Sequence, residues 1–171
     1  MPNYYVIDTN VLLVANEVHD DVSDDCFLAC IKKLTDIQQK GCVVIDDSYL
    51  ILKEYGKKLN SKKSKDAGDV FLKWLLQNEQ NEKYCQQVSI EGNNFVFNGE
   101  LSNFDEPDKK FVTVANAHPN KPKILQATDC KWLNWENELL ERGITVEFLC
   151  PEDIRKFYNK KFPKEKKLSK K

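Results

Sequence analysis

The segment Tyr4–Asn10, with the sequence YYVIDTN, decides the fold because an apolar run of strand-forming residues stops on a carboxylate, Asp8. Three more acids lie in comparable settings: Glu54 inside a helical pattern, Asp108 at the start of another, and Asp129 after a later apolar strand. In an open α/β fold, ligands gather where the carboxyl ends of parallel strands meet. Acids delivered there form a cluster that binds hard divalent cations, as metal-assisted phosphodiester hydrolysis requires.

Short apolar runs and helical patterns alternate along the rest of the chain. Strands are expected at residues 4–8, 42–45, 87–90, 124–128 and 144–149, with a hairpin through 92–94 into 95–97 as a further alternative. Helices are expected from Ser23 to Gly41, after a cap at Asp47 or Ser48, around 70–75, from Asp105 to Pro119, around 135–143 and from Pro151. This alternation predicts the α/β class, as a three-layer α/β/α sandwich around a central, mostly parallel sheet.

Length and charge suggest one domain with a basic extension. The 171 residues carry a formal net charge of -1. Residues 156–171 contain eight lysines and one glutamate, a net +7, which leaves -8 on residues 1–155. We therefore expect one folded domain over residues 1–157 and a basic, disordered tail over 158–171, which serves either polyanion binding or solubility.

The six cysteines form no C-x-x-C pair and have no histidine at zinc spacing. Most lie in apolar runs, so we expect buried free thiols in a reducing, cytoplasmic setting. The N-terminus lacks the pattern of a signal peptide, and no segment approaches about 20 apolar residues, so no membrane partner is expected.

Together, the acidic motifs resemble the PIN-domain family. The resemblance rests on Asp8-Thr9-Asn10 after a strand, Glu54 in a helix, Asp105-x-x-Asp108 before a helix and Thr128-Asp129 closing a strand, in that family's order. It covers roughly residues 3–155. It implies a small α/β/α sandwich with Mg²⁺- or Mn²⁺-dependent nuclease activity, usually on RNA, and many members are toxins of bacterial toxin–antitoxin pairs.

Carried over by position, the resemblance implies a catalytic set and a slightly larger metal-binding set. The catalytic set is Asp8, Glu54, Asp108 and Asp129, and the metal-binding set adds Asp105. Asn10 and Thr128 match polar residues that support the ligands. Whether Asp105 or Asp108 ligates the metal, and whether one or two ions bind, stays open. The implied partners are nucleic acid, above all RNA, with an antitoxin or other protein and a homodimer as further alternatives.

Other polar and aromatic residues have two interpretations each. Five lysines near Glu54 are placed either to bind nucleic acid or to solvate a helix face: Lys53, Lys57, Lys58, Lys62 and Lys63. Trp132 and Trp135 either stack on unpaired bases or belong to the core. His19 and His118 belong to no catalytic pattern.

Two other functions compete with a metal-dependent endonuclease. A haloacid-dehalogenase-type phosphatase also has an aspartate after its first strand, but it needs a second one two residues later, where this chain has Asn10. A catalytically silent PIN-like module that binds RNA or protein is the other alternative, although the acid set is complete. Singly, each aspartate also fits a turn or a helix cap.

Overall fold

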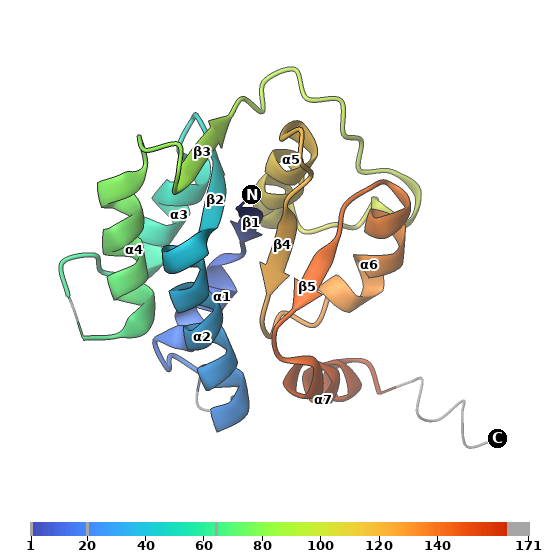
Figure 1. Cartoon of the computed structure of the whole chain (residues 1–171). Helices are drawn as coiled ribbons and strands as arrows, with labels where there is room; N and C mark the ends of the chain where they lie inside the picture. Colours follow the sequence, from blue (N-terminus) through green and yellow to red (C-terminus); the bar gives the residue numbers. More distant parts are fainter. Residues whose placement is uncertain (1, 20, 64, 164–171) are drawn as a thin grey trace.

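The computed structural model describes residues 2–19, 21–63 and 65–163 and contains a five-stranded, all-parallel sheet (Figure 1). The strand order is β3-β2-β1-β4-β5. The strands are β1 (Asn3–Ile7), β2 (Gly41–Asp46), β3 (Cys85–Val88), β4 (Lys123–Gln126) and β5 (Val146–Phe148). The predicted α/β sandwich is confirmed, with a sheet that is parallel throughout.

Strand β1 lies at the centre of the sheet, between β2 and β4. Tyr5 pairs with Val43 on one side and with Lys123 on the other. Because all strands run the same way, their carboxyl ends share one edge. The residues that follow β1 and β4 are therefore neighbours in space although they are far apart in sequence.

Helices cover both faces of the sheet. They are α1 (Thr9–Ala15), α2 (Asp24–Lys40), α3 (Leu50–Lys58), α4 (Ala67–Asn78), α5 (Lys109–Ala117), α6 (Trp132–Glu141) and α7 (Pro151–Lys161), with short 3-10 turns η1 (Gly99–Leu101) and η2 (Glu106–Asp108). Right-handed crossovers place α1 to α4 on one face and α5 and α6 on the other (Figure 1). This arrangement gives the three layers.

Local contacts explain the helix starts near the carboxyl edge. Ser23 caps α2 by accepting a hydrogen bond from the Cys26 amide. The predicted cap of α3 at Asp47 or Ser48 is wrong. Asp46 caps it instead: its two carboxylate oxygens accept from the Leu50 and Ile51 amides at 2.7 and 3.0 Å.

One glycine fixes how closely two helices approach. A Cβ added at Gly68, in α4, would lie 2.2 Å from the Leu12 carbonyl oxygen of α1. Next to it, Asp69 accepts hydrogen bonds from the Asn16 side chain and the Asn60 amide, both at 2.9 Å. Where α1 and α4 approach closely, Asp69 therefore connects α4 by hydrogen bonds to the end of α1 and to the loop after α3.

The alternative hairpin into a strand at 95–97 is wrong, since the structure has no strand between residues 89 and 98. The carbonyls of Val96 and Asn98 accept hydrogen bonds from the Arg142 guanidinium. The Phe95 and Phe97 rings pack on each other, and Phe97 also packs on Phe104. Side-chain hydrogen bonds and ring contacts, rather than pairing with a neighbouring strand, therefore hold this segment in place.

The C-terminal boundary expected after residue 157 falls too early, because α7 continues to Lys161. Residues 164–171, most of the expected disordered tail, lie outside the described residues. No helix in the described part of the chain is long and apolar enough to span a membrane.

The cysteine prediction is corrected in one respect. Cys26 and Cys150 are joined in a disulfide, whereas the other four cysteines, Cys30, Cys42, Cys85 and Cys130, are buried free thiols, as expected. The disulfide links α2 to the residue that precedes α7.

Candidate acidic metal centre

Asp8 occupies the carboxyl end of the central strand and caps α1. Its Oδ1 accepts a hydrogen bond of 2.8 Å from the Asn10 amide. Its Oδ2 is buried and has no hydrogen-bond partner among the described residues, and only 5% of the residue is exposed. Burial, with the negative charges of nearby carboxylates, first of all Asp108, raises the pKa of Asp8 to about 8.

Three further aspartates meet beside Asp8. One carboxylate oxygen from each of Asp105, Asp108 and Asp129 lies within 4.8 Å of the others. Burial and then the charge of Asp129 raise the pKa of Asp108 to about 6, and burial raises the pKa of Asp129. Ionised carboxylates at this spacing repel one another, so the group favours protons or a cation.

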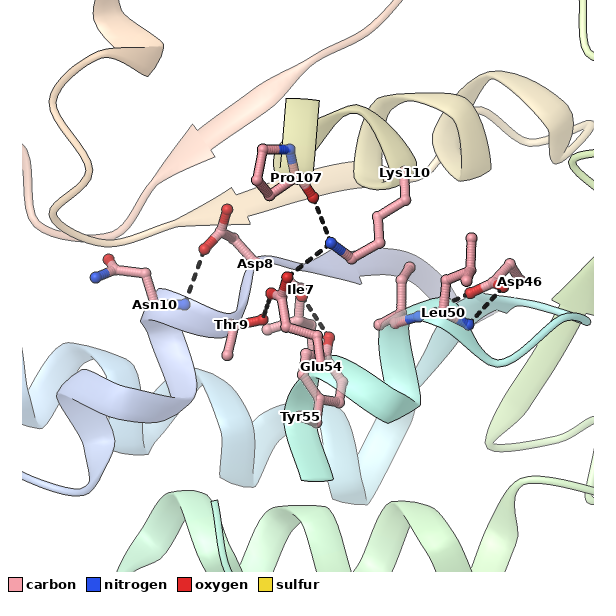
Figure 2. Close-up of polar contacts among 11 residues, drawn as sticks. Ile7, Asp8, Thr9, Asn10, Asp46, Leu50, Glu54, Tyr55, Pro107 and Lys110 are labelled. Atoms are coloured by element: carbon pink, nitrogen blue, oxygen red, sulfur yellow. Dashed lines mark hydrogen bonds and ion pairs between the residues drawn. The ribbon is translucent and has the colours of Figure 1, made fainter. Parts of the chain in front are cut away.

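Glu54 reaches the same edge from α3 and is held by two partners (Figure 2). Its Oε1 accepts from the Lys110 ammonium at 2.7 Å, and its Oε2 accepts from the Thr9 hydroxyl. Lys110 also donates to the carbonyl of Pro107. Glu54 contributes negative charge at both Asp8 and Asp108. Glu54 and Asp8 lie beside the compact three-aspartate group and are not part of it.

A polar link joins the ends of β1 and β4. The Asn10 side-chain oxygen accepts from the Thr128 amide at 2.6 Å and from the Thr128 hydroxyl at 3.0 Å. The buried Gln126 holds the turn after β4 from within, because its side-chain oxygen accepts from the amides of Ala127 and Asp129. These bonds fix the turn that presents Asp129, which is how Asn10 and Thr128 support the acids.

The structure gives Asp105 and Asp108 different surroundings. Asp105 forms an ion pair of 2.9 Å with Lys131, and its side chain is one-third exposed. Asp108 lies at the N-cap of α5 without a capping hydrogen bond from its side chain. Both oxygens of Asp108 are therefore better placed to exchange a proton for a cation, whereas Asp105 already has a cationic partner.

The lysines predicted to bind nucleic acid divide into two groups. Lys53, Lys57 and Lys58 line an open groove of about 660 Å³ between α3 and the η2–α5 segment, next to Glu54. Lys62 and Lys63 lie in the loop after α3 and do not line that groove.

Both tryptophans after Asp129 and one of the two histidines are buried residues of the fold. Trp132 and Trp135 are buried around Phe104, so the core interpretation is confirmed and base stacking is wrong. His118 is also buried and pairs with the Gln86 side chain at 2.7 Å.

Sequence reasoning missed the cations and polar groups that hold the acids. Lys110 and Lys131 each follow a predicted ligand by two residues, and this spacing is the one signal that could have suggested them. Thr9 lay inside the first motif but had no assigned role. Gln126 was hidden inside an apolar strand, where its buried side chain carries no sequence signal.

No family model, no curated protein and no solved structure matches this chain. The resemblance to PIN domains therefore stays a prediction based on the order of the acidic motifs.

The donor set itself fits a hard divalent cation. It consists of carboxylate oxygens, one of which, Asp8 Oδ2, is buried without a hydrogen bond from any described group. The pKa of Asp8, Asp108 and Asp129 is raised in each case by burial together with neighbouring carboxylates. Mg²⁺ and Mn²⁺ prefer such oxygen ligands and would relieve this repulsion.

Proposed function

We propose that this protein is a metal-dependent endonuclease that hydrolyses phosphodiester bonds in single-stranded RNA. The observation that carries the proposal is Asp8, a buried carboxylate near further carboxylates, one of whose oxygens has no hydrogen-bond partner among the described residues. A carboxylate in that setting is destabilised unless a proton or a cation is present. The cap of α1 uses only one oxygen of Asp8, so the other oxygen is available to a metal ion.

The residues have separate parts in the proposed reaction. Asp8, Asp108 and Asp129 would hold Mg²⁺ or Mn²⁺, with Glu54 and Asp105 completing the acidic wall. A bound ion supplies positive charge for a phosphate oxygen and lowers the pKa of a water molecule so that it can attack. Asn10 and Thr128 keep β1 and β4 in the register that the acids need.

Lys110 lies where the acidic residues meet the groove. Its ammonium group neutralises Glu54 at 2.7 Å, and it lines both the acidic edge and the groove. A phosphate that approaches along the groove would meet this ammonium before it meets the acids. Lys110 is thus placed to hold a phosphodiester against the electrostatic repulsion of the carboxylates.

The groove favours a polyanion as substrate. Five lysines line it against two glutamates: Lys53, Lys57, Lys58, Lys109 and Lys110. Apolar side chains, including Leu50 and Ile90, form part of the same lining. A single strand presents both phosphates and unpaired bases, which match cationic and apolar surface respectively. An antitoxin partner and a homodimer stay predictions from the family resemblance.

The test is cleavage of end-labelled single-stranded RNA with Mn²⁺ or Mg²⁺. Activity should stop in EDTA, and the products should carry 5′-phosphate and 3′-hydroxyl ends because water, rather than the ribose 2′-hydroxyl, attacks. The variant Asp8→Asn should be inactive. Glu147→Gln is the matched control, since this acid pairs with Lys33 and Lys123 away from the site.

Three results would contradict the proposal. A 2′,3′-cyclic phosphate product, or cleavage that persists in EDTA, would refute the mechanism. A folded protein that cleaves neither RNA nor DNA in the presence of metal would instead support a silent module that binds RNA or a protein partner.

A further inference from the structure

Three cysteine sulfurs meet where α2 packs against the start of α7. Cys26 and Cys30 lie one turn apart on α2, so their side chains share one face of the helix. Cys150 is the residue before α7 and is disulfide-bonded to Cys26. The Cys30 Sγ lies 4.0 Å from the Cys150 Sγ. All three sulfurs lie within 4.8 Å of one another, and all three residues are buried.

A buried carboxylate, Asp153, lies near this cluster but outside the 4.8 Å group of sulfurs. Asp153 lies three residues after Cys150 in the first turn of α7, and only 9% of it is exposed. Its two oxygens accept hydrogen bonds from the Ser23 amide at 2.8 Å and the Ser23 hydroxyl at 2.6 Å. Its negative charge also raises the pKa of the Cys30 thiol, after the larger effect of burial. Asp153 is therefore near enough to Cys30 for its charge to affect the ionisation of the thiol.

We propose that the reduced protein binds one Zn²⁺ through Cys26, Cys30 and Cys150, with the Asp153 carboxylate as the fourth ligand. Structural zinc sites are closed and four-coordinate, and they use thiolates alone or together with histidine nitrogen, while carboxylate oxygen is also a known zinc ligand. The burial of all four residues matches a closed site. The acidic metal centre contains no sulfur, so the two sites would select different ions: carboxylates suit Mg²⁺ or Mn²⁺, and thiolates suit zinc.

The Cys30–Cys150 distance needs little adjustment, whereas the Asp153 carboxylate must move toward the sulfurs to become a ligand. Zn–S bonds of about 2.3 Å place the sulfurs of a tetrahedral site about 3.8 Å apart, and the Cys30–Cys150 pair is already at 4.0 Å. The Cys26 and Cys150 sulfurs must separate once their bond is broken. Their Cα atoms are 5.0 Å apart, so rotation about the side-chain bonds can provide this separation without moving α2 away from α7.

The disulfide and the zinc site exclude each other, and the exchange balances. A dithiol reductant donates two electrons and two protons to the Cys26–Cys150 bond, which leaves two thiols and the oxidised, cyclic reductant. Zinc binding then releases the protons of the three thiols. The ion and three thiolates carry a net charge of -1, and the Asp153 carboxylate makes it -2. The hydrogen bonds from Ser23 and the positive end of the α7 dipole offset part of this charge.

The site would hold α7 in place in either redox state. The far end of this helix carries Lys161, whose charge lowers the pKa of Asp129. The attachment of α7 at Cys150 thus also sets the position of a cation beside the acidic metal centre. A zinc ion would maintain this attachment under conditions that reduce the disulfide.

The test uses Co²⁺ as a spectroscopic substitute for zinc in the full chain. The protein is reduced with a dithiol, freed of metal, and checked for six titratable thiols, the number of cysteines in the sequence. We expect one equivalent of Co²⁺ to give thiolate-to-metal charge-transfer absorption and the bands of a tetrahedral ion, and one equivalent of Zn²⁺ to abolish both. Carboxylate sites give no thiolate band, so the acidic centre cannot imitate this signal.

Variants separate the proposed ligands from other buried thiols. Cys30→Ser should lose the thiolate band although Cys26 and Cys150 remain able to form their disulfide. Cys42→Ser, at a buried thiol elsewhere, should leave the band unchanged, as should Asp8→Asn. Asp153→Asn should weaken zinc binding at least tenfold while a thiolate band persists.

A fully reduced, folded protein without a thiolate band would overturn the proposal, and so would a band that survives Cys30→Ser. Neither result would affect the proposed nuclease activity, which depends on other residues.

Discussion

Replacing Asp8 with Asn should stabilise the metal-free protein at alkaline pH. The pKa of Asp8 rises from 3.8 to about 8 in the folded chain, so the folded state binds more protons than the unfolded state between these values. The free energy of unfolding of the wild type must then fall as the pH rises through this window. At about 1.4 kcal/mol for each pH unit, the ionised carboxylate destabilises the fold by up to about 6 kcal/mol at pH 9.

Asparagine keeps the helix cap and removes the charge. Its side-chain oxygen can still accept from the Asn10 amide, but its buried NH₂ group needs a partner, which costs about 1–3 kcal/mol. We expect the variant to match the wild type near pH 5, where the wild-type penalty is only about 2 kcal/mol, and to exceed it by about 4 kcal/mol at pH 9. Urea unfolding followed by circular dichroism, in EDTA at several pH values, measures this difference.

Asp46→Asn is the matched control. Asp46 is also fully buried, but both of its oxygens accept hydrogen bonds from backbone amides. An amide there would direct an N–H group at another donor, so this variant should lose about 1–3 kcal/mol. An Asp8→Asn variant that is less stable than the wild type at pH 9, or a difference that does not change with pH, would refute the reasoning.

Three further predictions concern the groove, the link between strands and the metal. Charge reversal of Lys57 and Lys58 should weaken binding of single-stranded RNA and reduce the slope of log affinity against log salt by about 1.4, measured by filter binding, whereas Lys62→Glu should have little effect. Asn10→Ala should cost about 1–3 kcal/mol in urea unfolding, because it removes the acceptor of two hydrogen bonds. Calorimetry in buffers of different ionisation enthalpy should show that Mn²⁺ affinity rises from pH 5 to 8 and that binding releases protons. The reason is that a cation displaces protons from Asp108, whose pKa is about 6, and from its neighbours. An affinity that does not change over this pH range would argue against these ligands.

The sequence contained good local signals for the sheet and for the acids at its edge. One apolar run stops on Asp8 and another is followed by Asp129, and these acids marked the ends of β1 and β4. The reason is that a buried strand consists of apolar residues, whereas the residue after its carboxyl end can be polar. Glu54 was found because the helical spacing around it was clear. These predictions used information within a few residues of each position.

The errors came from contacts between distant parts of the chain. The Phe95–Phe97 segment is a run of strand-forming residues, but the carbonyls of Val96 and Asn98 accept hydrogen bonds from Arg142. The Cys26–Cys150 disulfide joins residues separated by 124 positions, and no local pattern announces such a pair. The first amides of α3 donate to Asp46 rather than to Asp47 or Ser48, and the N-cap position itself is Tyr49, which has a left-handed backbone (φ 62°).

The central place of β1 has a consequence for the order of folding during synthesis. β1 is the first strand to be made, yet one of its two neighbours, β4, begins at Lys123. Until β4 has left the ribosome, Asp8 ends a strand with an open side, and the Asn10–Thr128 bonds cannot form. Pairing over so long a loop is also slow. The nascent chain therefore lacks the acidic cluster until the segment through Asp129 has left the ribosome, so any activity of that cluster cannot appear before that point.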